Sequence, residues 1–391
     1  MYPKAEYQYA STILMHTPSY ELFDGVIHPS AALYQGYFNA EEATKEHQNY
    51  IAALKNHGIN VYVVREILER SALDSLRVLA GKCLTYDTSK LKGVSSDDVE
   101  SYRLSIINKM TKADLIRTIL LRPTVQLTNS NINTGVQASY IQAPLMNLFF
   151  ARDQMINTAK GSIICRMNSV QRATECDVMD YCLCQIGMPA IYKIKGENSY
   201  LEGGDFIPMG DMALIGQGLR TSQEAIDELL ENDLLGTNTL VVVRDHWLNQ
   251  EQMHLDTYFN VMDRDLVSMS ARRLRATPES NMFLTVDIYS RPNSAQPYQK
   301  TVEGVPFVEF LKDRGISIIP IEREDEAQYA GNYLCIAPRH VMVVAGQTTD
   351  LRQRFVSHNV KAEYIPLDNL IQGYGAAHCM TQVLQRTDSE K

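Results

Sequence analysis

The 391-residue sequence lacks a long uncharged apolar run and any block of basic residues, and it contains few cysteines. A membrane-spanning helix needs about 20 consecutive, mostly apolar residues, so we expect no membrane association. The 37 basic residues are outnumbered by 46 acidic ones, and the formal net charge is −9. This balance disfavours binding to nucleic-acid phosphates. The seven cysteines are an odd, sparse set, typical of reduced thiols in a cytosol rather than of a disulfide framework.

The beginning of the chain also lacks the apolar core of an export signal, because Glu6, Tyr7 and Tyr9 stand where that core would lie. We therefore expect a cytoplasmic protein. What remains is an ordinary globular composition, with 45% hydrophobic and 21% charged residues. A chain of this length is sufficient for two or three average domains or for one large α/β unit.

Short β-like runs alternate with helical stretches along most of the chain, a pattern typical of an α/β fold. The first unit is representative. It predicts a strand around His28, a helix that is capped by Asn39 and ends at Gly58, and a strand at 60–64. Further strands are predicted at 161–167, 212–218, 239–245, 281–289, 316–322 and 340–346.

One segment interrupts this alternation, because residues 66–122 contain no convincing strand but at least three helical stretches. Ser95 with Asp98, and Thr111 with Asp114, have the spacing of two capping boxes. We interpret this block as an inserted helical subdomain. The chain is then divided into a first part of the catalytic unit, the helical insertion and the remainder of the catalytic unit, at 1–65, 66–125 and 126–391.

Reactive side chains are concentrated in four short segments that follow the helical block. These segments are NLFFARD, which ends at Asp153, LEGGD at 201–205, MHLDT at 253–257 and GYGAAHCM at 373–380. In an extended MHLDT segment, His254 and Asp256 would project from the same face. A carboxylate beside an imidazole raises its pKa and orients it for general acid–base catalysis. The alternative is a surface His–Asp pair on a strand.

The two glycines of LEGGD permit positive φ angles or a close approach of the backbone to another group. Glu202 and Asp205, on either side of the glycines, could direct two anions into one cavity. Their mutual repulsion must then be offset by a cation, and a planar guanidinium suits two carboxylates well. A solvated turn is the alternative.

Cys379 is the candidate nucleophile, because the small residues at 375–377 leave room for a substrate to approach its thiol. If the chain is extended there, the neighbouring His378 points to the opposite face, so a base brought through space, such as His254, is the better candidate. Three other cysteines lack a matching histidine or a second CxxC pair, and we interpret them as buried helical thiols rather than as metal ligands. They are Cys176, Cys182 and Cys184.

The order and spacing of the four segments together resemble the arginine deiminase family of guanidino-modifying enzymes. The resemblance extends over nearly the whole chain and includes FDGVIHPS near the start and NYLCIAPRHVMVV at 332–344. It implies an α/β propeller of five ββαβ units around a pseudo-fivefold axis, with the site in the central channel. It also implies a helical insertion where 66–122 lies, a feature that agmatine deiminases and dimethylarginine hydrolases lack.

The resemblance assigns a catalytic role to five residues. Cys379 matches the nucleophile, His254 the general acid–base and Glu202 the carboxylate that orients this histidine. Asp153 and Asp256 match the two carboxylates that clamp the guanidinium of the substrate.

Further residues are expected at the other end of the substrate. Asn147 occupies a position that helps to hold the backbone end, and Arg172 and Arg220 match two arginines that bind the substrate carboxylate. We also place Asp205 in the substrate site. Thr221 and Glu224 predict a capping box directly after Arg220, which would place Arg220 on a strand-to-helix loop.

One position departs from the family pattern, because Tyr374 stands five residues before the nucleophile, where typical arginine deiminases have an arginine. The implied reaction is hydrolysis of L-arginine to L-citrulline and ammonia through a covalent Cys-amidino intermediate. No metal and no organic cofactor is implied, the only partner is a small guanidino substrate, and we expect a homo-oligomer. The alternatives are a deiminase of another guanidino compound such as agmatine, an amidinotransferase, and a catalytically idle relative.

Overall fold

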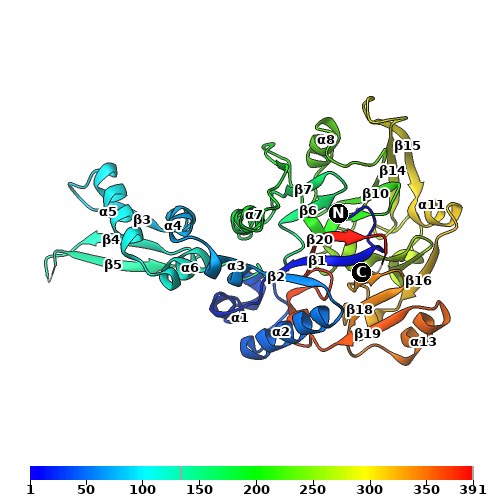
Figure 1. The fold of residues 1–391 in the computed structure, drawn as a ribbon, viewed down its shortest axis with the longest axis horizontal. Coiled ribbons are helices and arrows are strands. Elements are labelled where there is room, and N and C mark those ends of the chain that lie inside the picture. The colour runs from blue at the N-terminus through cyan, green and yellow to red at the C-terminus, as the bar shows by residue number, and fades with distance from the viewer. Residues whose placement is uncertain (133, 390–391) are drawn as a thin grey trace.

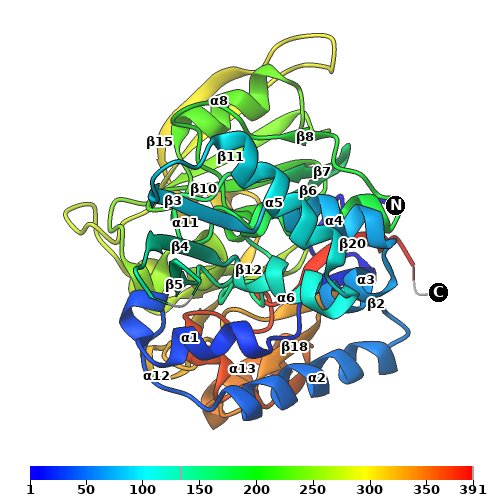
Figure 2. The same ribbon diagram turned by 90° about the vertical axis from the view of Figure 1, so that its left-hand side faces the viewer.

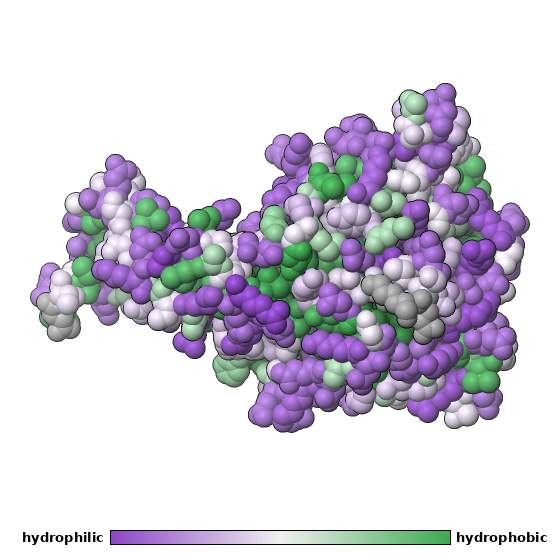
Figure 3. Space-filling view, in the orientation of Figure 1, coloured by the Kyte–Doolittle hydropathy of each residue, from purple (hydrophilic) through white to green (hydrophobic). Residues whose placement is uncertain are grey.

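The structure is a computed structural model that describes residues 1–132 and 134–389. A broad α/β body carries a narrow lobe that projects from one side (Figure 1). Figure 2 shows the molecule from the lobe side, with α2 along the lower edge of the body. The face drawn in Figure 3 is mostly hydrophilic, and apolar side chains gather on it near the junction of lobe and body. Among the described residues, no helix combines the length and apolar character of a membrane span.

The first and last strands of the described chain pair with each other, which brings the two termini close together (Figure 1). In this sheet the central β1 (Tyr9–Met15) is parallel to β2 (Asn60–Val63) and antiparallel to β20 (Gln382–Thr387). The crossover that a parallel pair requires is α2 (Ala40–Asn56). The fold therefore closes the chain into one unit at this sheet.

The same combination of one antiparallel and one parallel neighbour recurs in the other sheets of the described body. Three of these sheets have three strands each. The first contains β6 (Met155–Thr158), β7 (Gly161–Ile164) and β8 (Tyr192–Lys193), and the second contains β12 (Phe259–Asp263), β13 (Leu266–Ser270) and β16 (Ser317–Ile321). The third contains β17 (Leu334–Ala337), β18 (His340–Val344) and β19 (Lys361–Ile365). A larger sheet contains β9 (Phe206–Pro208), β10 (Met212–Gln217), β11 (Thr239–Arg244), β14 (Thr285–Ser290) and β15 (Gln299–Pro306).

Longer helices connect the strands of the body, namely α7 (Glu175–Gln185), α8 (Gln223–Glu231), α11 (Phe307–Asp313) and α13 (Thr349–Ser357). Shorter helices are α1 (Phe23–Val26), α9 (Leu255–Tyr258), α10 (Ala271–Leu274) and α12 (Arg323–Glu326). The α/β class is confirmed, whereas a closed five-bladed propeller remains a prediction.

Cys176 and Cys182 on α7 are buried as predicted, but Cys184 on the same helix is exposed, so that part of the prediction is wrong.

The projecting lobe is mixed α/β rather than all-helical. It follows α3 (Val64–Arg70) and contains α4 (Leu73–Gly81), β3 (Thr85–Lys90), α5 (Ser96–Lys109), α6 (Lys112–Leu121), β4 (Thr124–Asn129) and β5 (Val136–Ile141). The expectation of no strand between residues 66 and 122 is wrong, because β3 pairs with β4 in a three-stranded sheet. Strand β3 is a partly exposed edge strand, TYDTSK, with no apolar alternation to identify it in the sequence.

A second correction concerns the strand predicted around His28. This segment instead forms α1 and then a 3₁₀ turn at Pro29–Ala32. Pro29 fits the first position of a helical turn, and the ring of His28 accepts a hydrogen bond from the Ala31 N–H at 3.2 Å. The other predicted strands are confirmed, with bounds that differ by a few residues, as β2, β7, β10, β11, β14, β16 and β18.

An apolar core formed by the first and last units positions the segment that contains Cys379. Residues of β1, α2 and β18 form one buried cluster, to which Phe149, Phe150, Cys379 and Met380 also belong. Tyr50 on α2 donates a hydrogen bond from its hydroxyl to the Ala377 carbonyl at 3.1 Å. The candidate nucleophile therefore lies in a turn that is packed against this core rather than in a free loop.

The two predicted capping boxes in the lobe are confirmed, and they allow a test of local stability. Ser95 Oγ accepts a hydrogen bond from the Asp98 N–H at 3.1 Å, and Asp98 accepts one from the Ser95 N–H. We expect Ser95→Ala to lower the free energy of unfolding by about 1 kcal/mol, because an N-cap acceptor is lost. Urea unfolding measures the difference. Ser96→Ala is the matched control, and equal losses in both variants would contradict the capping role.

Candidate active site

A narrow cavity of about 20 Å³ lies where three of the four reactive segments meet. Predicted site residues that line it are Asn147, Asp153, Arg172, Arg220, His254, Tyr374 and Cys379. Glu202, Asp205 and Asp256 are buried and do not line this cavity. Glu202 pairs with His254 and Asp256 contacts Cys379, both of which do line it. A second cavity of about 400 Å³ lies beside the first, with Tyr374 in the lining of both. The structure thus brings together residues that are separated by more than two hundred positions in the sequence.

His254 lies directly before α9, and its own backbone is extended. The prediction that MHLDT is extended throughout is wrong from Leu255 onward, because Asp205 Oδ1 accepts a hydrogen bond from the Leu255 N–H at 2.8 Å. A carboxylate in this position stabilises the start of a helical turn. Leu255 is fully buried as predicted, and His254 and Asp256 reach the site without sharing a strand face.

The imidazole of His254 is surrounded by carboxylates. Its Nε2 lies 2.8 Å from Glu202 Oε2, and its Nδ1 lies 3.7 Å from Asp153 Oδ1. Burial acts to lower the pKa of His254, but the charge of Asp153 and the hydrogen bond with Glu202 outweigh it and raise the pKa to about 9. Burial likewise acts to raise the pKa of Glu202, and His254 lowers it to about 2. At neutral pH these two groups form an imidazolium–carboxylate pair.

The thiol of Cys379 lies against a carboxylate rather than against a cation. Its Sγ is 3.4 Å from Asp256 Oδ2, which also pairs with His378 Nδ1 at 2.6 Å. Burial first, and then the charges of Asp256 and Asp153, raise the pKa of Cys379 well above its usual range. Without a cation in the cavity, Cys379 is a neutral thiol, and a bound cation would favour the thiolate that attacks.

Two buried carboxylate oxygens are left for such a cation. Among the described residues, neither Asp153 Oδ1 nor Asp256 Oδ1 accepts a hydrogen bond. The other oxygen of Asp153 accepts one from Arg172 Nη1 at 2.6 Å. Because buried acceptors are normally paired, this arrangement suits a ligand with several N–H donors and a positive charge.

The two arginines expected at the substrate carboxylate lie in different environments. Arg172 is bound at every nitrogen of its guanidinium, by Glu175, Asp153 and the carbonyls of Asn147 and Phe150. Arg220 donates from Nη2 to Gln250 Oε1 at 2.9 Å, and its buried Nε has no partner among the described residues. Arg220 is therefore the better placed of the two to receive an anion, and the roles of both remain predictions.

Arg220 lies on a strand-to-helix loop between β10 and α8, as predicted, but the capping residue is shifted by one position. Ser222 caps α8 by accepting a hydrogen bond from the Ala225 N–H. The predicted box of Thr221 with Glu224 is wrong, because the Thr221 hydroxyl instead donates to Asp205 Oδ2 at 2.6 Å.

The LEGGD segment serves close approach rather than a positive φ, since neither of its glycines appears among the residues with left-handed backbone. A Cβ atom on Gly203 would lie 1.9 Å from the Arg152 carbonyl, and one on Gly204 would lie 2.7 Å from His254 Nδ1.

Both oxygens of Asp205 are occupied by hydrogen bonds from the Leu255 N–H and the Thr221 hydroxyl, and burial raises the pKa of Asp205 to about 7. Its direct contact with substrate stays a prediction.

Two groups of functional residues were missed by the sequence analysis. Asn332 Oδ1 accepts hydrogen bonds from the N–H groups of Ala376 at 2.8 Å and Cys379 at 3.1 Å, and its Nδ2 donates to the Asp256 carbonyl at 3.0 Å. Asn332 thus connects two reactive segments. It opens the segment NYLCIAPRHVMVV, but a buried asparagine before a strand carries no signal of this role.

The second missed group lies beneath Cys379. His378 Nε2 is 3.4 Å from Glu6 Oε1, and Glu6 pairs with Arg386. Burial acts to raise the pKa of Glu6, but Arg386 and Arg152 lower it well below its usual range. This chain of charges joins the two ends of the polypeptide to Asp256, and only the pairing of β1 with β20 brings it together.

Comparison with known proteins relates the whole chain to one family. The sequence profile described as arginine deiminase matches residues 31–386. An arginine deiminase from Halobacterium salinarum is 24% identical over 477 aligned positions, covering 98% of this chain and 96% of that protein. An arginine deiminase from Metamycoplasma arthritidis is 24% identical and covers 96% of this chain and 94% of its own length.

Solved structures have a similar fold. DDAH from Pseudomonas aeruginosa, in complex with citrulline, has a TM-score of 0.55 and 15% identity, covering 95% of this chain and 98% of that one. The N-terminal domain of ArgZ, a cyanobacterial arginine dihydrolase bound to its product, has a TM-score of 0.57 and 13% identity, covering 96% and 98%. These likenesses support the α/β architecture of the body.

The raised pKa of Cys379 predicts slow alkylation of this thiol in the substrate-free protein. Rising pH converts the thiol to the reactive thiolate, so we expect the iodoacetamide rate at Cys379 to be still increasing at pH 9, above the ordinary thiol pKa of about 8.5. Peptide mass spectrometry measures the rate site by site. Exposed Cys184 controls for reagent activity, and a plateau at Cys379 below pH 8 would contradict the predicted environment.

Asn332 is expected to position the nucleophile rather than to touch substrate. Asn332→Ala removes three buried hydrogen bonds, and we expect a loss of about 2 kcal/mol in unfolding free energy and a fall in kcat of roughly 100-fold, because the thiol is displaced. Asn157→Ala is the matched control, since Asn157 is also buried and bonded to Gln382 and Val383 but contacts neither Cys379 nor Asp256. Equal loss of kcat in both variants would refute the positioning role.

Proposed function

Since the chain belongs to the arginine deiminase family and is a hydrolase that acts on guanidino C–N bonds, we propose that it hydrolyses L-arginine to L-citrulline and ammonia. The observation that carries this proposal is the cavity in which the Cys379 thiol faces buried carboxylates with unpaired oxygens. Such a site is electrostatically incomplete without a cation. A flat guanidinium with several N–H donors satisfies both its charge and its hydrogen-bonding requirements.

Binding and activation of the nucleophile are one event in this mechanism. Asp153 and Asp256 hold the guanidinium through the oxygens that are otherwise unpaired, with its central carbon toward Cys379 Sγ. Its positive charge, together with that of His254, lowers the pKa of the thiol and yields a thiolate. The carboxylates keep the guanidinium charged, which polarises the carbon for attack.

Two displacements follow at that carbon. The sulfur forms a bond to carbon, and His254 donates its proton to the departing nitrogen, so ammonia leaves as the C–N bond breaks. A covalent amidino-thioether remains on Cys379. His254, now neutral, accepts a proton from water as the water oxygen attacks the same carbon. The S–C bond then breaks and releases citrulline, and Glu202 keeps the imidazole oriented throughout.

Arg220 and Asn147 are expected to hold the α-carboxylate and backbone end of arginine. The unpaired Nε of Arg220 and the position of both residues on the cavity wall support this role. Arg172 pairs with Asp153 in the free protein. This contact uses Asp153 Oδ2 and leaves Oδ1 for the guanidinium, so Arg172 contributes less than Arg220 to binding a substrate carboxylate.

Tyr374 supports a second candidate function, the deimination of another guanidino compound such as agmatine. Typical family members have an arginine at this position, and a tyrosine offers no charge to an α-carboxylate. Tyr374 also borders the larger neighbouring cavity, so the substrate end that it contacts has room for a different group. An amidinotransferase, which passes the amidino group to an amine, is the remaining candidate.

We also propose that the body sheets surround the cavity as five blades of one propeller. The shared combination of antiparallel and parallel pairing supports this arrangement. Site residues lie next to strands of different sheets, with Arg220 after β10 and Cys379 before β20, as expected for a site on a common axis.

A citrulline colour assay on a panel of guanidines tests the proposed function. We expect citrulline and ammonia from L-arginine without an added amine acceptor, and no turnover with Cys379→Ala. Cys184→Ala, which removes an exposed thiol, is the matched control with unchanged turnover. Arg220→Ala should lower kcat/KM for arginine at least tenfold and leave kcat/KM for agmatine nearly unchanged. Absence of product from every guanidine would refute the proposal, and a requirement for an amine would favour the transferase.

A further inference from the structure

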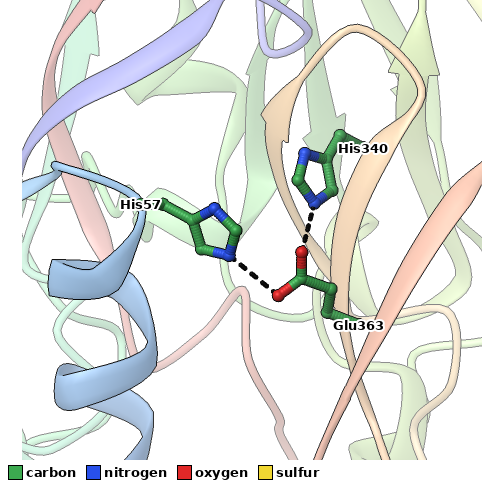
Figure 4. A group of neighbouring side chains, drawn as sticks. All are labelled: His57, His340 and Glu363. Carbon is green, nitrogen blue, oxygen red and sulfur yellow. Dashed lines mark hydrogen bonds and ion pairs between the residues drawn. The ribbon is translucent and has the colours of Figure 1, made fainter.

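Two histidines and a glutamate from distant parts of the sequence meet on the surface of the body, outside the catalytic cavity (Figure 4). His57 directly follows α2, His340 begins β18, and Glu363 lies in β19. Nε2 of His57 is 2.8 Å from Glu363 Oε2, and Nε2 of His340 is 2.7 Å from Glu363 Oε1. The two imidazoles thus approach one carboxylate from different sides, as Figure 4 shows.

The spacing of these side chains suits a transition-metal ion. Each residue offers one ligand atom, and these atoms lie within 4.8 Å of one another. A tetrahedral zinc ion, with ligands about 2.1 Å away, holds neighbouring ligand atoms about 3.4 Å apart. Small side-chain rotations therefore suffice to bring the three atoms around one ion. The side chains are 28%, 16% and 29% exposed, so an ion has access from solvent and a water molecule completes its coordination.

The charges around the cluster also suit a divalent ion. Burial acts to raise the pKa of Glu363, but its hydrogen bonds with His57 and His340 lower it to about 2. Burial lowers the pKa of His340, which favours the neutral imidazole that binds metals. The competing cation is Lys361, whose Nζ lies 3.1 Å from Glu363 Oε1 on a side chain that is 66% exposed. It can move into solvent when an ion binds.

We propose that His57, His340 and Glu363 form a binding site for a zinc ion, separate from the catalytic cavity. Two imidazole nitrogens and one carboxylate select zinc and similar transition metals over magnesium and calcium, which prefer all-oxygen sites. The bound ion connects the end of α2 to the sheet of β18 and β19. Since α2 also holds the Cys379 segment through Tyr50, the ion stabilises the packing of the first unit against the last.

Zinc titration of the full chain, after treatment with a chelator and its removal, tests this site. We expect one zinc ion bound at the cluster, a binding constant at least tenfold weaker in His57→Ala and in His340→Ala, and no binding of Mg²⁺ there. A zinc concentration 100-fold above the dissociation constant should raise Tm by about 3 °C. His246→Ala removes an exposed histidine elsewhere and is the matched control with unchanged zinc binding.

A second zinc-binding event at the catalytic site must be distinguished, because Asp153, Glu202 and His254 also lie within 4.8 Å of one another. The titration is therefore repeated with His254→Ala, which removes one of these three ligands and in which binding at the surface cluster should persist. Glu363→Gln, which retains the hydrogen-bonding shape without the charge, should weaken zinc binding even if a histidine variant folds poorly. Zinc binding that is unchanged in all three cluster variants, or no zinc bound apart from the event lost in His254→Ala, would overturn the proposal.

Discussion

The site depends on negative charge buried in excess of the protein's own cations. Asp153, Glu202 and Asp256 are almost inaccessible to solvent. His254 pairs with Asp153 and Glu202, Arg172 pairs with Asp153, and Asp256 pairs with His378. Like charges in a medium of low polarity must be offset. The protein offsets them incompletely, so one oxygen on each of Asp153 and Asp256 accepts no hydrogen bond from the described part of the chain. The same incomplete balance keeps Cys379 neutral until a cation arrives.

This charge arrangement is held in place by contacts outside the reactive motifs. Asp205 fixes the turn that follows His254, and Asn332 ties the Cys379 segment to Asp256. Behind them, Glu6, from the opposite end of the chain, links His378 to Arg386. Buried polar networks of this kind are stable only when their members are paired. Asp153 Oδ1, in the cavity lining, is among the buried atoms that accept no hydrogen bond from the described residues.

Local patterns predicted much of the fold because they act over a few residues. Runs rich in β-branched residues became strands, and Ser95 and Thr111 cap helices as their spacing indicated. The predictions failed where tertiary contacts decide the conformation. The edge strand at Thr85–Lys90 exists because β4 pairs with it, and the MHLDT segment turns into a helix because a distant carboxylate caps it. No strand forms around His28 because Pro29 begins a 3₁₀ turn there.

The reactive residues were predictable from motifs, but their pairing was not, since partners such as Arg172 and Asp153 depend on how the units pack. Tyr374 illustrates what the packing adds. It has left-handed backbone with a φ of 68°, so its side chain is placed between the catalytic cavity and the larger one beside it. Because Arg172 already compensates Asp153, the proposed contact with the α-carboxylate of a substrate depends mainly on Arg220. In the proposed mechanism, recognition of the guanidinium is therefore built deep into the fold, while recognition of the rest of the substrate depends on a few residues of the cavity wall.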